Sequence, residues 1–397
     1  MKLSEKYKGI SSSPTLAIDA KFKAMKAEGQ DVVGFGAGEP DFDTPMHIKN
    51  AAIEAINRGI TKYTPASGTV ELKKAIVRKL ERENGLIYDV SQIVVSNGAK
   101  HSLVNVFGAI LNPGDEVIIP APYWVSYPEM VRLADGVPVS LETYERDMFK
   151  MTPQMLENAI TPKTKALIVN SPSNPTGMVY SKDELYAIAQ ICIKHKIFVV
   201  SDEIYEHLIY EGETVSIASF GENIKSLTII VNGLSKTYSM TGWRIGYTAS
   251  SPEIAKLMSN VQSHATSNPN SIAQYAAVTA LDSGLDFVEN MKTEYIKRRD
   301  YMVDRINSIE GVSCIKPVGA FYVMMNINEL FGKEICGVLI NSSNDFAEAL
   351  LNKAKVALVP GEGFFAPGYL RWSYAVSINT IKKGLDRLEK FLNNEYN

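Results

Sequence analysis

One short segment of the sequence places a lysine and an arginine where both could do chemistry. Residues 233–247 read GLSKTYSMTGWRIGY, with Lys236 between a serine and a threonine and Arg244 eight residues later. A lysine partly removed from water has a lowered pKa and becomes a usable nucleophile. A guanidinium can hold two oxygens of a phosphate at once. Each residue alone is typical of a surface lysine or a salt-bridged arginine, so their combination is the informative feature.

Polar residues also follow other apolar runs, at positions where a strand would end. A helix start in SNGAKH would offer free N–H groups to a phosphate, and Lys100 there opposes the helix dipole unless an anion lies nearby. Asp202 could accept a hydrogen bond from a protonated ring nitrogen, although such an aspartate more often caps the next helix. These segments are SNGAKH (96–101), PAPYW (120–124), NSPSNPTG (170–177) and SDEIY (201–205).

The C-terminal part of the chain adds another arginine with two possible roles. Arg371 lies in the strand-like run YLRWSYA, after the flexible segment PGEGFFAPG. Its guanidinium could clamp a substrate carboxylate through two N–H groups, or it could pair with a surface acid. The Asn-Pro turn at Asn174 is similarly open, because an ordinary loop would have the same composition.

The elements that must position these residues follow an α/β pattern between residues 90 and 250. Short β-branched runs alternate there with turns and helical patterns. The runs are apolar throughout, as in central strands covered by helices on both faces. In such sheets ligands bind at the carboxyl ends of the strands, where the polar segments lie. The predicted strands are 93–95, 117–119, 166–169, 197–200, 227–231 and 245–249, and a helix is predicted over 102–110.

After about residue 282 the pattern changes. A long charged segment, residues 287–309, predicts one extended helix that leads into an α+β part. In that part the sequence predicts strands over 321–325 and 356–359 and a helix over 345–353.

Length and composition exclude several classes of protein. The 397 residues predict two or three domains, and 41 Lys+Arg against 44 Asp+Glu leave no basic excess for nucleic acid. The three cysteines lack metal-knuckle or redox spacing, and no two histidines stand three or four residues apart, so no metal site is expected. No secretory signal or membrane-spanning run is visible, and a cytoplasmic location is expected.

Taken together, these segments resemble the fold-type I, class I aminotransferases that use pyridoxal 5′-phosphate (PLP), and most closely their aspartate aminotransferase subgroup. The resemblance covers nearly the whole chain, and it is specific because of the number and order of the motifs. They are FGAGEPDFDTP (35–45), KYTPASG (62–68), SNGAKH, PYWVSYPEM (122–130), NSPSNPTG, SDEIYE (201–206), LSKTYSMTGWRIGY (234–247) and PGYLRWSYA (367–375).

The resemblance implies a role for each motif residue. Lys236 would bind the cofactor covalently and move the substrate proton, Asp202 would pair with the ring nitrogen, and Tyr205 would donate to the phenolic oxygen. The remaining cofactor contacts would be Trp124 and Asn174 at the ring and Ala99, Lys100, Ser235, Arg244 and a neighbouring subunit's Tyr63 at the phosphate. The substrate contacts would be Arg371 at the α-carboxylate, Lys100 at a distal carboxylate, and Gly38, Trp124 and Asn174.

The resemblance also implies a fold and a reaction. We expect a mainly parallel seven-stranded sheet with helices on both faces and a smaller α+β domain. The expected boundaries are 1–45 for an N-terminal segment of the small domain, 46–285 for the large PLP-binding domain and 286–397 for the small C-terminal domain. The expected reaction is ping-pong transfer of an amino group from an L-amino acid, most simply aspartate, to 2-oxoglutarate by a homodimer with shared active sites.

Several alternatives stay open beside this expectation. PLP could instead serve transamination of aromatic, neutral or prephenate-type substrates, or a lyase reaction. The lysine that prephenate enzymes carry near Ser11 or Ser12 is missing, and Phe364, Phe365 and Trp372 replace the commoner residues around Arg371. A dinucleotide-binding dehydrogenase is disfavoured because GFGAGEP misplaces its third glycine and no helix follows. A non-catalytic relative is disfavoured because Lys236 is present.

Overall fold

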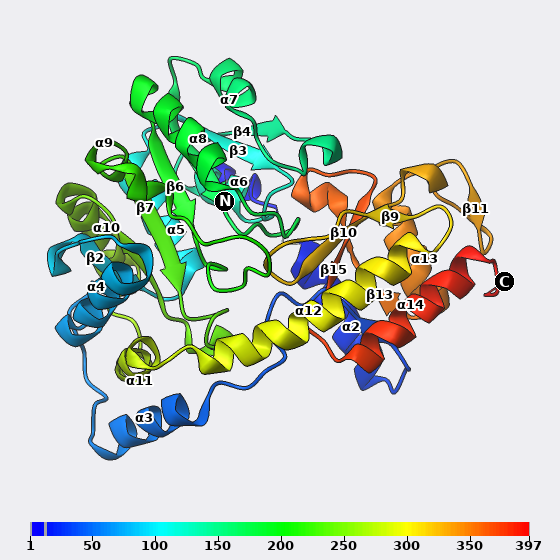
Figure 1. Cartoon of the computed structure of the whole chain (residues 1–397), viewed down its shortest axis with the longest axis horizontal. Coiled ribbons are helices and arrows are strands. Elements are labelled where there is room, and N and C mark those ends of the chain that lie inside the picture. Colours follow the sequence, from blue (N-terminus) through cyan, green and yellow to red (C-terminus); the bar gives the residue numbers. More distant parts are fainter. Residues whose placement is uncertain (1, 12–13, 397) are drawn as a thin grey trace.

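The computed structural model describes residues 2–11 and 14–396. A seven-stranded sheet fills one half of the molecule (Figure 1), with strand order β2-β8-β7-β6-β5-β3-β4. Only β8 runs antiparallel to its neighbours, so the sheet is mainly parallel, as predicted. The strands are β2 (Ile93–Ser96), β3 (Glu116–Ala121), β4 (Val137–Glu142), β5 (Thr164–Asn170), β6 (Phe198–Asp202), β7 (Thr228–Gly233) and β8 (Gly246–Ala249).

The central strands form because their residues are buried on both faces. All residues of β2, β7 and β8 are buried, which matches their continuous apolar runs. β4 was not predicted from the sequence, and its residues are half-buried or exposed along the edge of the sheet. The hydrophobic signal of β4 is therefore weak, whereas β2 at the opposite edge of the sheet is fully buried and was predicted.

Helices cover both faces of this sheet and hold its register. One face packs against α5 (Ala99–Ile110), α6 (Tyr127–Leu133) and α10 (Pro252–Ala265). The other face packs against two groups of helices. They are α7 (Pro153–Ala159), α8 (Lys182–His195) and α9 (Glu222–Lys225) over the middle strands, and α3 (Met46–Asn57), α4 (Val70–Asn84) and α11 (Ser271–Asp282) over β2 and β8.

The second half of the molecule is an α+β layer joined to the first by one long helix. That helix, α12 (Asp286–Asn307), runs from the seven-stranded half to the other half (Figure 1). A four-stranded sheet of order β14-β15-β10-β9 follows, with all its pairs antiparallel. The elements are β9 (Ser313–Cys314), β10 (Tyr322–Asn326), β11 (Glu334–Ile335), β12 (Val338–Leu339), α13 (Ser343–Ala354), β13 (Val356–Ala357), β14 (Val359–Pro360), β15 (Tyr369–Ser373) and α14 (Ile378–Leu392).

The strand predicted over 356–359 is split into two. β13 pairs with β1 (Val33–Gly34) and β14 pairs with β15, so the chain changes partners after Ala357. The pair β1-β13 ties the segment that includes α2 (Pro14–Ala27) to the C-terminal half, whereas α1 (Glu5–Lys8) lies against the large-sheet half, where Lys6 pairs with Asp135 at 3.0 Å. The domain boundaries at residues 45 and 285 stay a prediction.

One loop of the large sheet belongs to the core of the other half. After β6, Ile204, Tyr205 and Leu208 pack among apolar residues of α12, β10 and α14. A bridge between Ile209 and Gly319 extends this contact. Among the residues that the model describes, no helix is both long and apolar enough to cross a membrane.

Candidate active site

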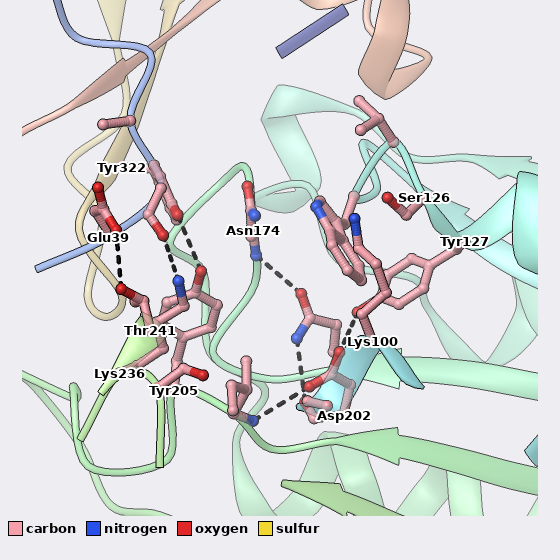
Figure 2. Close-up of a pocket in the computed structure, with 18 of the residues that line it drawn as sticks. Glu39, Lys100, Ser126, Tyr127, Asn174, Asp202, Tyr205, Lys236, Thr241 and Tyr322 are labelled. Carbon is pink, nitrogen blue, oxygen red and sulfur yellow. Dashed lines mark hydrogen bonds between the residues drawn. The ribbon is translucent and has the colours of Figure 1, made fainter. Parts of the chain in front are cut away.

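A cavity of about 420 Å³ lies at the carboxyl ends of the large sheet, where it meets the second half. Figure 2 shows Lys236, Tyr205 and Tyr322 on one side of this cavity, Lys100, Ser126 and Tyr127 on the other, and Asp202 between them. All predicted site residues except Tyr63 line it. They are Gly38, Ala99, Lys100, Trp124, Asn174, Asp202, Tyr205, Ser235, Lys236, Arg244 and Arg371.

Lys236 lies in the turn after β7, with its amine directed into the cavity. The ammonium donates a hydrogen bond to the carbonyl of Gly38 and lies 5.7 Å from the ring centroid of Tyr205. Burial lowers the pKa of Lys236 to about 8, and the charges of Arg371 and Arg244 act in the same direction. A substantial fraction of this amine is therefore neutral, and thus nucleophilic, at a mildly alkaline pH.

Asp202 ends β6 as a deeply buried carboxylate. Its Oδ2 accepts a hydrogen bond of 2.7 Å from the hydroxyl of Tyr127, and its Oδ1 accepts one of 3.2 Å from the N–H of Ile204. Burial raises the pKa of Asp202 to about 6, although the bond from Tyr127 opposes this change. The carboxylate does not cap a long helix, so it is available to a cationic or N–H group in the cavity.

Two tyrosines of the cavity lining face each other. The hydroxyls of Tyr205 and Tyr322 lie 2.9 Å apart, and both side chains are buried. Burial raises the pKa of Tyr205 well above its ordinary value, so the phenol stays protonated and can donate a hydrogen bond. The amide of Asn170, whose Nδ2 donates to the carbonyl of Asp202 at 3.1 Å, joins the ends of β5 and β6.

The start of α5 forms an anion seat. The helix begins at Ala99, one turn earlier than predicted, so Lys100 lies in its first turn. Arg244 has a positive φ of 58°, and its guanidinium donates at 2.8 Å to the carbonyl of Thr241. A Cβ at Gly98 would overlap this guanidinium, so only glycine lets Arg244 lie over the helix start. Helix N–H groups and a guanidinium together are typical of a phosphate site.

Arg371 is buried on β15 with its guanidinium at the cavity wall. It donates at 2.9 Å to the Oδ1 of Asn174 and at 2.8 Å to the carbonyl of Gly36. Its Nε has no hydrogen-bond partner, and no carboxylate of the described residues pairs with it. A guanidinium that is 1% exposed and held only by neutral oxygens is matched to an incoming anion.

Lys100 and Trp124 lie together at the cavity wall. The ammonium of Lys100 is 4.8 Å from the ring centroid of Trp124. Lys100 is exposed to solvent and Trp124 is half-buried, so both offer a face to a molecule in the cavity. The indole ring packs nearly at right angles to the ring of Tyr127, at a centroid distance of 5.4 Å.

Tyr63 lies away from the cavity. Its side chain is 92% exposed in the single chain, in the segment between α3 and α4. The position is compatible with a contact to another subunit, and the role implied for Tyr63 stays a prediction.

Ser11 donates its N–H to Glu129 at 3.3 Å, whereas Ser12 lies outside the described residues.

The three unusual residues around Arg371 do not line the cavity. Phe364 is buried, and its ring centroid lies 5.0 Å from the guanidinium carbon of Arg371. Trp372 points to the other side of β15 and packs on Phe35 at 4.6 Å. Phe365 is exposed and stacks on Tyr123 at 6.0 Å. Phe364 thus packs against the guanidinium, and none of the three residues belongs to the lining of the cavity.

Several residues that line the cavity were not predicted from the sequence. Tyr127 lies one helical turn after Trp124 in a quoted motif, and this spacing was an available signal. Tyr322 gave no such signal, because the strand predicted over 321–325 encloses it, although in the structure it is the first residue of β10. The others are Asp19, Gly36, Ala37, Glu39, Val125, Ser126, Asn170, Ile204 and Thr241.

Comparisons with known proteins find relatives along nearly the whole chain. The family model described as aminotransferase class I and II matches residues 30–388. The chain is 50% identical to an aspartate aminotransferase of Geobacillus stearothermophilus over 99% of both chains, and 45% identical to an aspartate/prephenate aminotransferase of Nitrosomonas europaea over 99% of this chain and all of the relative. The crystal structure of an aspartate aminotransferase from Rhizobium meliloti superposes with a TM-score of 0.96 at 43% identity and 99% coverage of both chains.

Proposed function

This chain belongs to the class I and II aminotransferases, and we propose that its cavity transfers the amino group of L-aspartate to 2-oxoglutarate. The observation that carries this proposal is the meeting of three groups in one cavity. They are the amine of Lys236 with its lowered pKa, the buried carboxylate of Asp202 and the unpaired guanidinium of Arg371.

The residues of the cavity fit PLP as the cofactor. The anion seat at Gly98 and Arg244 suits the phosphate, and the buried Asp202 suits a protonated ring nitrogen that would relieve its desolvation. Tyr205 offers a phenol donor for the ring oxygen, and Trp124 offers an indole face for the ring. When bound, PLP supplies an electron sink for the electron pair left on the substrate carbon.

The protein groups then perform three tasks. Lys236 would hold the cofactor and, once released from it, carry the proton of the substrate α-carbon. Asp202 would keep the ring nitrogen protonated, held in place itself by Tyr127. Arg371 would bind the α-carboxylate, exchanging the carbonyl of Gly36 for a charged partner.

The preference for a dicarboxylic substrate rests on Lys100. Its ammonium lies over Trp124 at the cavity wall, where it can reach a second carboxylate. Relatives at 50% and 49% identity are named aspartate aminotransferases, and others are named for prephenate as well. The absence of a lysine at Ser11 and Ser12 favours aspartate over prephenate for this chain.

The homodimer belongs to the same proposal. Tyr63 is exposed and is not among the residues that line the cavity of its own chain, as expected of a residue that completes the site of a second copy. Closed two-fold dimers are the commonest assemblies, and they place such a residue twice. A cytoplasmic location stays a prediction.

The proposed reaction predicts a reversible spectral change. We expect purified protein with PLP to show a visible absorbance band that falls when L-aspartate is added and returns with 2-oxoglutarate. Replacement of Lys236 by alanine should lower aspartate turnover by at least about 10²–10⁴-fold, because one group holds the cofactor and moves the proton. The control Lys225→Ala removes a lysine paired with Glu222 on α9 and should leave the band unchanged. Absence of the band, or full turnover by Lys236→Ala, would refute the function.

The substrate assignment has its own test. We expect Lys100→Ala to lower kcat/KM for L-aspartate by about 10–100-fold, the range of one charge-assisted hydrogen bond. The kcat/KM for the substrate L-alanine should stay within about twofold of the parental value. Steady-state kinetics with both amino acids check this difference, and aromatic amino acids and prephenate in the same assay rank the alternatives. Equal losses for aspartate and alanine would contradict the role of Lys100 while leaving transamination intact.

A further inference from the structure

A buried polar cluster lies against the Lys236 turn, outside the cavity. It joins α4 to the loop after β6 and to the end of β7. Lys79, Glu206, Asn232 and Thr237 are each at most 3% exposed, so the cluster is an interior structure and not a surface network. Its members are Lys79, Glu83, Asn84, Glu206, His207, Asn232 and Thr237, none of which lines the cavity.

Glu206 holds the end of β7. Its carboxylate accepts hydrogen bonds from Lys79, from Asn84 at 3.0 Å and from Asn232 at 2.6 Å. The other end of the Asn232 amide accepts the N–H of Gly233 at 2.7 Å. Despite burial, the charge of Lys79 and these hydrogen bonds lower the pKa of Glu206 to about 2, so it stays an acceptor at every working pH. The backbone that enters the lysine turn is thereby fixed to α4.

His207 holds the other side of the same turn. Its Nε2 lies 2.9 Å from the carboxylate of Glu83, and its Nδ1 lies 3.1 Å from the hydroxyl of Thr237. Burial acts to raise the pKa of Glu83, but His207 and Lys79 lower it below its ordinary value, so Glu83 is an acceptor. Nε2 must therefore carry a proton. In the neutral ring, Nδ1 then accepts a hydrogen bond from the hydroxyl of Thr237.

The same cluster has donor atoms that a metal ion could use, but its charges argue against one. Oxygen and nitrogen atoms of Glu83, Glu206 and His207 lie within 4.8 Å of one another. The ammonium of Lys79 already contacts Glu206 and lies 3.6 Å from Glu83. A divalent cation would lie against this buried ammonium, so the cluster is better described as a completed ion-pair network.

We propose that Glu206 and His207 are positioning residues, which fix the turn of Lys236 relative to Asp202 and Tyr205 by holding Asn232 on one side and Thr237 on the other. The inference rests on the proposed function. Asp202, Tyr205, Glu206 and His207 belong to one short segment. Its first two residues line the cavity and its last two bind the lysine turn from outside, so this segment sets the spacing between catalytic groups that come from neighbouring strands.

Removal of the Thr237 hydroxyl is the most selective test of this positioning role. Thr237→Val keeps the shape of a residue that is 2% exposed and removes only the group that binds His207. We expect kcat with aspartate to fall about tenfold or more, because small displacements of a reacting group are costly, while KM stays within about twofold. Thr237→Ser keeps the hydroxyl and should restore kcat to within about twofold of the parent.

A readout on the cofactor-free protein separates positioning from stability. The rate at which an amine-acylating reagent modifies Lys236, followed by peptide mass spectrometry over a series of pH values, gives the pKa of this amine. A loosened turn admits water, so in Thr237→Val we expect that pKa to rise from about 8 toward the ordinary value of 10.5. Thr237→Ser should keep the parent value.

Thr228→Val is the matched control. Thr228 lies at the far end of β7, is fully buried, and donates its hydroxyl at 2.8 Å to the carbonyl of Ile224. The substitution has the same chemistry and the same burial, so it should lower the melting temperature without changing kcat or the pKa of Lys236. If Thr237→Val does not fold, Thr237→Ala removes the same hydroxyl without added bulk and carries the test.

Two results would overturn the inference. One is a Thr237→Val protein with parental kcat and a parental pKa of Lys236, and the other is a Thr228→Val protein that loses as much of both. A parent protein that fails to transaminate aspartate refutes the proposed function instead. In that case a shifted pKa of Lys236 in cofactor-free Thr237→Val still supports the positioning role.

Discussion

Asp202 shows how burial and function oppose each other at a single residue. The carboxyl is 3% exposed and is held by one phenol and one backbone N–H, without a cationic side chain in hydrogen-bond contact. Its raised pKa of about 6 is the consequence of this burial. The cofactor-free protein therefore carries a carboxylate that is poorly solvated at neutral pH, which a protonated ring nitrogen would neutralise.

This arrangement predicts a pH-dependent stability of the cofactor-free protein. A carboxyl whose pKa is raised from 3.8 to about 6 stabilises the fold below pH 3.8 and loses that contribution as the pH rises through 6, about 3 kcal/mol in all. We therefore expect Asp202→Asn to gain melting temperature relative to the parent as the pH is raised from about 4 to 7. Differential scanning calorimetry at several pH values measures this gain.

Asp31→Asn provides a control of opposite sign. Hydrogen bonding to Lys383 lowers the pKa of Asp31, so its contribution is present above its ordinary pKa of 3.8 and is lost as the pH falls further. This variant should lose stability relative to the parent as the pH is raised from about 2 to 4 and should then differ from it by a constant amount up to pH 7, although its exposed position makes the effect small. A gain for Asp202→Asn that does not vary with pH would contradict the assigned pKa.

The sequence predicted those site residues that stand at strand ends or in quoted motifs. Asp202, Asn174 and Lys236 follow apolar runs, and the topology of a parallel sheet brings such positions together. Tyr322 and the carbonyl of Gly36 could not be predicted in this way. They reach the cavity from the C-terminal half and the N-terminal segment, whose docking depends on side-chain packing that no local pattern encodes.

At the scale of elements, the start of α5 depends on a close approach of two chain segments. Gly98 has a positive φ of 87° and leaves room for the guanidinium of Arg244, while Gly246 of β8 lies against the backbone of Ala99. The anion seat is thus made by packing a strand and a loop against a helix end, and not by the helix alone.

This packing predicts a selective effect of Gly98→Ala. The added Cβ would displace Arg244, so we expect the affinity of the cofactor-free protein for PLP to fall about tenfold or more, the worth of one charge-assisted hydrogen bond. Fluorescence titration with PLP measures the change. The control Gly85→Ala shares a positive φ, of 65°, but its Cβ would meet nothing within 4 Å. Gly85→Ala should cost about 1 kcal/mol of stability and leave PLP affinity unchanged. Equal losses of PLP affinity in the two variants would contradict the role of Gly98 in the anion seat.

The sequence predicted the buried elements better than the marginal ones. Continuous apolar runs gave β2, β3, β5, β6, β7 and β8 close to their observed bounds. The strand β4 and the change of partner between β13 and β14 were not predicted, because the residues of β4 are only half-buried or exposed and a switch between sheets leaves no periodic signal in the sequence.

At the scale of the whole molecule, the proposed homodimer can be tested through Tyr63. If Tyr63 completes the site of the other subunit, Tyr63→Ala and Lys236→Ala chains are each impaired alone but complement each other when mixed. Random reassociation of equal amounts should restore about a quarter of the parental activity, since half of the dimers are hybrids with one intact site each. Enzyme assays after mild dissociation and mixing measure this recovery.

A mixture that stays at the level of the separate variants would contradict the shared site. Mixing Lys225→Ala with Lys236→Ala provides a reference for the exchange itself, because Lys225 lies on α9 and outside the cavity. That mixture is expected to hold the average activity of its components.

The loop after β6 also determines how activity is lost when the protein unfolds. Because Ile204, Tyr205 and Leu208 are embedded in the core of the C-terminal half, loss of that core would uncover the phenol of Tyr205 beside Lys236. Heating or limited proteolysis is therefore expected to abolish turnover at the first cooperative opening of either half. Residual activity then serves as a sensitive gauge of intact structure throughout the chain.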